Sequence, residues 1–94
     1  DLEIDLIKQK VVIKGREVSL TSKQYALLSF LASNPGRVYS REQLLEEVWG
    51  YDYESDLRTV DVHIRHLREK IEERPADPRY ILTVWGAGYK FREV

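Results

Sequence analysis

The sequence contains neither cysteine nor methionine, and it has no long apolar run. Without cysteine the chain can form no disulfide and no thiolate zinc site, which suits a reducing compartment. No stretch approaches 18 uninterrupted apolar residues, so the sequence predicts no transmembrane helix. The first residues also lack the basic and apolar segments of a signal peptide. Because the chain has no initiator methionine, we expect it to be part of a longer protein with a further domain upstream.

An excess of basic residues is also missing. The 94 residues include 15 basic and 16 acidic side chains, which gives a net charge of −1. Nucleic-acid-binding domains are usually basic overall, so a DNA-binding function here would need a local concentration of positive charge. The hydrophobic content of 43% and the charged content of 33% are those of one ordinary globular domain.

The first twenty residues have the pattern of short strands. Leu2, Ile4 and Leu6 alternate with acidic residues, which is typical of a half-buried strand. A β-branched run follows at 11–13, and a third strand is predicted over 16–20. The connections are too short for parallel crossovers, so the sequence predicts an antiparallel sheet.

Two capping boxes predict where the next two helices begin. Thr21 pairs with Gln24, and Ser40 pairs with Gln43, so that each hydroxyl caps an amide while the glutamine side chain reaches back. Apolar residues at helical spacing follow both boxes. We expect the first helix to end before an Asn-Pro-Gly segment and the second to end at Gly50.

A third helix is predicted over 58–73, before Pro75. Its apolar stripe faces the core and consists of Val60, Ile64, Leu67 and Ile71. Its opposite side carries Arg58, Val62, Arg65, His66 and Glu69. Between residues 58 and 70 four basic side chains stand against two acidic ones, together with both histidines of the chain. This helix therefore has the most strongly biased surface in the sequence.

The C-terminal segment predicts a β-hairpin. Apolar and aromatic residues at 80–84 and 89–91 flank the turn Gly-Ala-Gly at 86–88. A two-residue strand at 38–39 fits between the first two helices, and the polar, aromatic segment 50–57 has the character of a loop.

The order of these elements predicts an α+β fold, a winged helix-turn-helix. The whole chain, 1–94, is expected to be a single domain. It consists of an N-terminal antiparallel sheet (1–20), a three-helix core (21–74) and a C-terminal hairpin wing (79–92).

Catalytic and metal sites are not expected. His63 and His66 have a spacing that could hold a metal, but the only further ligands nearby are Asp61 and Glu69. The glycines at 86–88 precede a strand rather than a helix, so they do not form a phosphate loop. No nucleophile with an adjacent base is evident. We therefore predict a protein that is not an enzyme and needs no cofactor.

Four segments of the sequence resemble a known family. They read VYSREQLL (38–45), VWG (48–50), RTVDVHIR (58–65) and GAGY (86–89). In order and spacing they are similar to the C-terminal effector domain of OmpR/PhoB-type response regulators, and the likeness extends from Leu2 to Phe91.

The resemblance implies sequence-specific binding of double-stranded DNA and regulation of transcription in a bacterial two-component system. The third helix would enter the major groove, and the wing would reach the minor groove. A receiver domain would lie upstream, in some relatives against the N-terminal sheet. A sensor histidine kinase would act on the full-length, cytoplasmic protein. The isolated domain would be monomeric and would pair head-to-tail on direct-repeat operators.

The resemblance also assigns functional residues. DNA contacts fall on Arg41, Trp49, Arg58, Thr59, Val62, His63, Arg65, His66, Arg68, Thr83, Trp85 and Tyr89. A loop facing RNA polymerase falls on Tyr51, Asp52, Tyr53, Glu54, Ser55 and Asp56. Val62 and His66 match positions that face base edges, whereas Arg41 and Trp49 match positions that contact phosphates. Four to six phosphate contacts predict a log–log salt slope of about −4 to −5.

Two departures from the family pattern leave an alternative open. Many relatives have arginine at the positions of His66 and Trp85, and both replacements lower the positive charge. The alternative is a winged-helix protein-interaction module that no longer binds DNA and uses Val62, Trp85 and the tyrosines. Two orientations are open for the Trp85 indole. It can face outward, or it can fold back over the hairpin or onto Tyr89.

Overall fold

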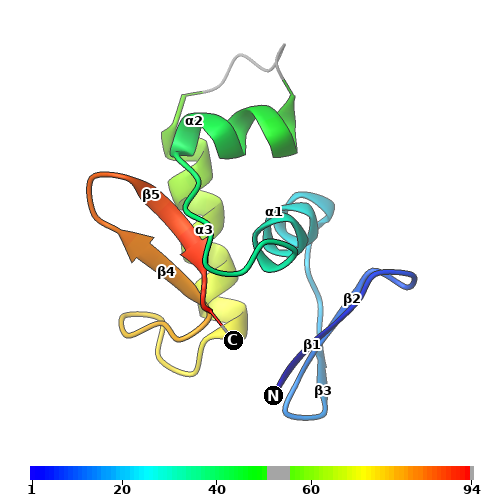
Figure 1. Cartoon of the computed structure of the whole chain (residues 1–94). Coiled ribbons are helices and arrows are strands. Elements are labelled where there is room, and N and C mark those ends of the chain that lie inside the picture. The colour runs from blue at the N-terminus through cyan, green and yellow to red at the C-terminus, as the bar shows by residue number, and fades with distance from the viewer. Residues whose placement is uncertain (51–55, 94) are drawn as a thin grey trace.

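The computed structural model describes residues 1–50 and 56–93 and is an α+β winged helix-turn-helix. The elements are β1 (Leu2–Asp5), β2 (Lys10–Ile13), β3 (Arg16–Val18), α1 (Ser22–Ala32), α2 (Arg41–Leu44), η1 (Leu45–Trp49), α3 (Arg58–Ile71), β4 (Ile81–Val84) and β5 (Gly88–Phe91). Figure 1 shows the N-terminal sheet and the C-terminal hairpin at opposite sides of the molecule, with the helices between them.

The N-terminal sheet is the predicted antiparallel meander, with strand order β1-β2-β3. Leu2 lies opposite Ile13, and Ile4 lies opposite Val11. Val11 is buried, and the other three side chains pack against the core from its edge. One face of the sheet therefore covers the helices, as the alternating pattern predicts.

The first strand is shorter than predicted, because Leu6 does not belong to it. β1 ends at Asp5, whose Oδ1 accepts hydrogen bonds from the backbone amides of Ile7 at 3.0 Å and Lys8 at 2.9 Å. These bonds turn the chain, and Leu6 is left 66% exposed in the turn.

Both predicted capping boxes are present. Thr21 Oγ1 accepts a hydrogen bond from the backbone amide of Gln24 at 3.2 Å, and Gln24 Oε1 accepts one from the backbone amide of Thr21 at 3.0 Å. The Ser40 and Gln43 pair repeats the arrangement at 3.1 and 2.8 Å. Each box satisfies two amides that the first helical turn would otherwise leave unpaired.

The second helix differs from the prediction in its last turn. Its α-helical part, α2, is only four residues long, and η1 continues it as a π-helical turn. The amide of Gly50 donates to the carbonyls of Leu45 at 3.2 Å and Glu46 at 2.9 Å. In addition, Lys23 Nζ donates to the carbonyl of Val48 at 3.0 Å. Gly50 has φ of 101° and ends the helix at the predicted position.

The third helix ends two residues earlier than predicted, at Ile71 rather than Glu73. Glu72 is only 7% exposed and has extended backbone angles. Its carboxylate accepts hydrogen bonds from the amides of Arg79, Tyr80 and Ile81, at 2.7 to 3.2 Å. These bonds hold the segment that leads into β4, which begins at Ile81.

The C-terminal hairpin pairs β4 with β5 and is attached to the helices through Tyr39. The amide and carbonyl of Tyr39 exchange hydrogen bonds with those of Tyr89, at 2.9 and 3.0 Å. The predicted strand at 38–39 is thus a single bridge. A Cβ at Gly88 would overlap the carbonyl oxygen of Tyr39, so glycine is required for this close approach.

A single hydrophobic core joins the sheet, the helices and the hairpin. Its buried members are Val11, Leu27, Leu28, Leu31, Tyr39, Leu44, Val60, Ile64, Leu67, Ile71 and Ile81. The four residues from α3 are the stripe predicted from the sequence, which fixes the orientation of the remaining faces of this helix.

Candidate nucleic-acid interface

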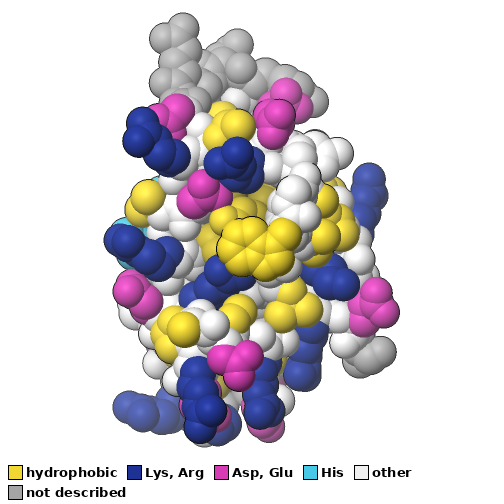
Figure 2. All heavy atoms as spheres, turned by 90° about the vertical axis from the view of Figure 1, so that its left-hand side faces the viewer, with side chains coloured by type: hydrophobic (Ala, Val, Ile, Leu, Met, Phe, Trp, Pro, Cys, Tyr) yellow, Lys and Arg dark blue, Asp and Glu magenta, His cyan; other side chains and the backbone are white. Residues whose placement is uncertain are grey.

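The outward side of α3 carries Val62, Arg65 and His66, and we call these three residues the reading face. Val62 is 42% exposed, Arg65 is exposed and His66 is half-buried. No described residue forms an ion pair or a hydrogen bond with the Arg65 side chain. Figure 2 looks onto the wing side of the molecule and shows Lys and Arg side chains spread over it, with acidic side chains between them.

The N-terminal end of α3 is organised by Asp56. Its Oδ1 accepts from the Arg58 amide at 2.7 Å, and its Oδ2 lies 3.1 Å from Arg58 Nη2. The hydrogen bond from the Arg58 side chain, followed by the one from its backbone amide, lowers the pKa of the Asp56 carboxyl. Arg58 remains largely exposed, with its charge partly balanced by its neighbour.

His63 belongs to a different surface from His66. Its Nδ1 lies 2.9 Å from the carbonyl oxygen of Thr59, and its ring meets Trp49 edge-on with centroids 4.8 Å apart. Lys23 Nζ lies 5.9 Å from the centre of the same indole. Trp49, Thr59 and His63 are therefore brought together where η1 packs on α3.

Arg68 points from α3 towards the wing. Its guanidinium donates to the carbonyl of Ile81 from Nε at 3.1 Å and from Nη2 at 2.9 Å, and Nη2 also donates to Thr83 Oγ1 at 2.7 Å. Burial lowers the pKa of Arg68. We call this arrangement the wing clamp, because it ties α3 directly to β4.

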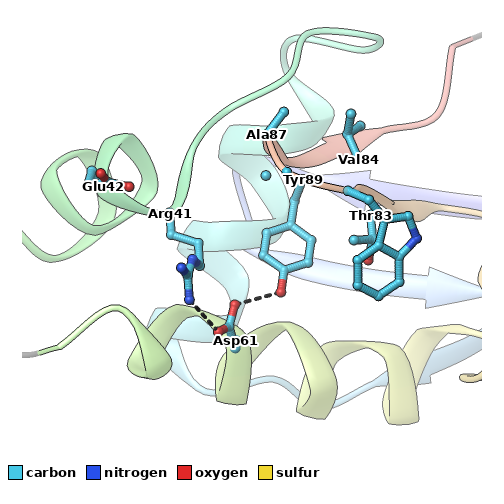
Figure 3. Close-up of a pocket in the computed structure, with 10 residues that line it drawn as sticks. Arg41, Glu42, Asp61, Thr83, Val84, Ala87 and Tyr89 are labelled. Carbon is cyan, nitrogen blue, oxygen red and sulfur yellow. Dashed lines mark hydrogen bonds and ion pairs between the residues drawn. The ribbon is translucent and has the colours of Figure 1, made fainter.

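Asp61 joins three elements, and Figure 3 shows Arg41 and Tyr89 converging on it. Its Oδ2 lies 3.1 Å from Nη1 of Arg41 in α2, and its Oδ1 accepts from the hydroxyl of Tyr89 in β5 at 2.6 Å. Burial, followed by the hydrogen bond to Asp61, raises the pKa of Tyr89 to about 12. The guanidinium carbon of Arg68 also lies over the ring of Tyr89, 5.6 Å from the ring centre. We call Arg41, Asp61 and Tyr89 the Asp61 network.

A hollow of about 390 Å³ lies between this network and the wing. Arg41, Glu42 and Asp61 form its helical side, and residues 83–89 form the other side. Trp85 is 90% exposed at the turn of the wing. Of the two orientations open for its indole, the outward one is therefore observed.

Sequence reasoning did not select Asp61 as a functional residue. From the sequence, Asp61 is identified only as a possible metal ligand near the histidines, because its partners Arg41 and Tyr89 are 20 and 28 residues away. The one available signal is an acidic side chain within a predominantly basic helix. Of the predicted polymerase-facing loop, Tyr51, Asp52, Tyr53, Glu54 and Ser55 lie outside the described residues.

Within 1–50 and 56–93, no group of three or more His, Cys, Asp or Glu side chains could hold a metal ion. No helix in this part of the chain has the length and apolar character needed to cross a membrane.

Comparison with known proteins identifies the family. A family model described as the C-terminal domain of transcriptional regulatory proteins matches residues 15–91. The transcriptional regulatory protein ResD of Bacillus subtilis is 54% identical over 91 residues, which make up 96% of this chain and 38% of ResD. The transcriptional regulatory protein SrrA of Staphylococcus aureus is 50% identical over 91 residues, and the matched part is again 38% of its length.

Solved structures give the same result. The response regulator DrrB of Thermotoga maritima, an OmpR/PhoB homologue, superposes with a TM-score of 0.93 at 43% identity, covering 99% of this chain and 42% of DrrB. The DNA-binding domain of Klebsiella pneumoniae RstA, solved in complex with the RstA box, superposes with a TM-score of 0.87 at 34% identity, covering 97% and 90%. The chain therefore belongs to the C-terminal domains of transcriptional regulatory proteins, of the OmpR/PhoB type.

Proposed function

We propose that this chain binds double-stranded DNA sequence-specifically, as the effector domain of a bacterial two-component response regulator. The observation that carries the proposal is the reading face, which presents an unpaired arginine, an exposed valine and a histidine beside the wing. The RstA domain, whose fold this chain shares, was solved with its DNA box. A net charge of −1 does not oppose DNA binding when exposed cations such as Arg65 lie on one face of the molecule.

In this proposal α3 lies in the major groove. Arg65 can present a two-pronged donor to a guanine edge, and Val62 can contact a thymine methyl group. His66 lies beside them as a hydrogen-bond donor or acceptor. Trp85 at the wing tip would pack its ring against the sugar or the wall of the minor groove.

The remaining predicted contacts divide into two groups. Trp49, Arg58 and Thr59, with His63 beside them, flank the reading face and are assigned to phosphates. Arg41 is assigned to a phosphate only when its ion pair with Asp61 opens. Arg68, Thr83 and Tyr89 are engaged with one another and with neighbouring groups, so we assign them to orienting the wing. Of the four arginines assigned to DNA, Arg68 is engaged with the wing and Arg41 with Asp61. Arg58 and Arg65 remain for ionic contacts, which lowers the expected salt slope to about −2.

The wider biology is proposed from the family. A receiver domain would precede this domain and be phosphorylated by a sensor histidine kinase in the cytoplasm. Two copies would bind head-to-tail on direct repeats, although the isolated domain would be monomeric. The loop 50–57 would face RNA polymerase. We assign the domain no enzymatic activity and no cofactor.

A salt titration tests the proposal. The chain is first used to select duplexes from a random library, and the affinity for the selected duplex is then measured from 50 to 300 mM salt. DNA binding through phosphates predicts a linear fall of log affinity with log salt at the slope given above. If no duplex is selected, or if the slope is near zero, the protein-interaction alternative takes its place.

A further inference from the structure

Asp61 is an acidic residue within the proposed DNA-binding surface, and its charge needs an explanation. It lies on α3 one residue before Val62, with its side chain 36% exposed. A carboxylate here opposes phosphate binding by simple repulsion. Stability alone is a weak reason to keep it, because partly exposed ion pairs contribute little to folding.

The partners of Asp61 are the groups that a phosphate would use. The Arg41 side chain is 45% exposed, and its Nη1 donates a hydrogen bond to Asp61 Oδ2 at 3.1 Å. The Tyr89 hydroxyl has one proton, and it donates that proton to Asp61 at 2.6 Å. While both contacts last, a phosphate at the hollow meets a neutralised arginine and a hydroxyl that cannot donate.

We propose that Asp61 is a specificity-determining residue, which withholds Arg41 and Tyr89 from DNA of any sequence and keeps the wing aligned with α3. The inference rests on the proposed function. Binding to random DNA is almost entirely a matter of phosphate contacts, so it gains from every cation that is released. Binding to a selected site depends on base contacts that fix the position of α3. The affinity for that site therefore rises less when a cation is released, and it falls when the wing is no longer held against α3.

The position of Asp61 in the fold supports both parts of the proposal. Its two bonds connect α2, α3 and β5, which are the elements that meet at the hollow. The raised pKa of Tyr89, about 12, is consistent with a phenol that stays protonated as a donor to this carboxylate. Among the ion-paired acids of residues 1–50 and 56–93, Asp61 is the one that also accepts a hydrogen bond from the wing.

The test compares Asp61→Asn with Glu17→Gln. Glu17 forms an exposed ion pair with Lys10 at 3.3 Å on the N-terminal sheet, so its replacement changes the net charge equally but away from the wing. The probes are a 24-base-pair duplex of random sequence and a duplex of equal length selected by the parent chain. Asp61→Asn should bind the random duplex about tenfold more tightly, with a salt slope steeper by about one. The ratio of selected to random affinity should fall, whereas Glu17→Gln should leave that ratio unchanged.

A second variant separates release of Arg41 from a general loss of structure. Adding Arg41→Gln to Asp61→Asn should return the random-duplex affinity to about the parent value. In the single variant, ring-labelled ¹³C spectra should show the pKa of Tyr89 falling towards 10, with the melting transition retained. A parallel loss of affinity for both duplexes, or a gain that persists without Arg41, would overturn the inference. Failure of the parent chain to show salt-dependent duplex binding would instead overturn the proposed function, and this inference with it.

Discussion

Arg65 and Arg68 lie three residues apart on the same helix, yet their surroundings differ in every respect. Arg65 is exposed and has no partner among the described residues, whereas Arg68 is half-buried and donates three hydrogen bonds to β4. Three residues correspond to about 300° of helical rotation, so the two side chains lie only about 60° apart around the helix axis. That angle is enough for Arg68 to reach β4 while Arg65 stays exposed.

This difference explains how a protein of charge −1 can present a DNA-binding surface. Counting charges treats Arg65, Arg68 and Arg41 alike, but only Arg65 offers its full charge to a ligand. The arginines that pair with Asp61 or with backbone carbonyls shape the surface instead. The useful quantity is therefore the number of unpaired cations on one face.

The largest expected effect is on stability, from Arg68→Ala. The substitution removes the wing clamp and leaves the carbonyl of Ile81 and the hydroxyl of Thr83 without their donor. We expect a loss of about 2–3 kcal/mol in the free energy of unfolding, measured by urea denaturation. A loss below about 0.5 kcal/mol would show that the clamp does not hold the wing.

Arg65→Ala should give the opposite result. Its stability should stay within about 0.5 kcal/mol of the parent, because the side chain is exposed and unpaired. Its affinity for the selected duplex should fall by about 1–3 kcal/mol if it reads a guanine. Affinity measured by fluorescence anisotropy provides the check, and an unchanged value would remove Arg65 from the reading face.

The two histidines allow a similar comparison at smaller magnitude. His66→Gln should weaken binding to the selected duplex roughly threefold at constant pH, because His66 lies on the reading face beside the base edges. His63→Gln should have a smaller effect on this affinity, because the His63 ring packs on Trp49 and its Nδ1 lies 2.9 Å from the Thr59 carbonyl. The reverse order would mean that η1, rather than the reading face, is nearer the DNA.

The smallest effect is expected for the wing tip. Trp85 is 90% exposed, so Trp85→Ala should leave the melting temperature unchanged. It should weaken duplex binding a few-fold without altering the salt slope, since the contact is not ionic. Trp85→Arg should steepen the slope by about one. A collapse of the melting temperature in Trp85→Ala would show that the indole has a structural role.

Local signals in the sequence predicted much of the fold. The capping boxes at Thr21 and Ser40 depend on residues three positions apart, so the sequence contains all the relevant information. The buried stripe of α3 follows from helical periodicity alone. The prediction was wrong by one or two residues where a carboxylate binds backbone amides further along the chain. Asp5 does so beside Leu6, and Glu72 does so beside Glu73.

The candidate site was less predictable, because its contacts are not local. Nothing near Asp61 in the sequence indicates that Arg41 and Tyr89 meet at its carboxylate. The same holds for Arg68, which resembles any other basic residue of the helix until β4 is in place. Helical periodicity alone is enough to predict the reading face. The wing clamp and the Asp61 network can be identified only from the tertiary fold.

The most direct test of the account follows the arginine side chains themselves. Nε–Hε signals in ¹⁵N–¹H spectra report each guanidinium separately, and the chain can be compared before and after addition of its selected duplex. We predict a large shift for Arg65 and a small one for Arg68, whose Nε stays bonded to the carbonyl of Ile81. A large shift at Arg68 with none at Arg65 would contradict the assignment of the reading face and the wing clamp.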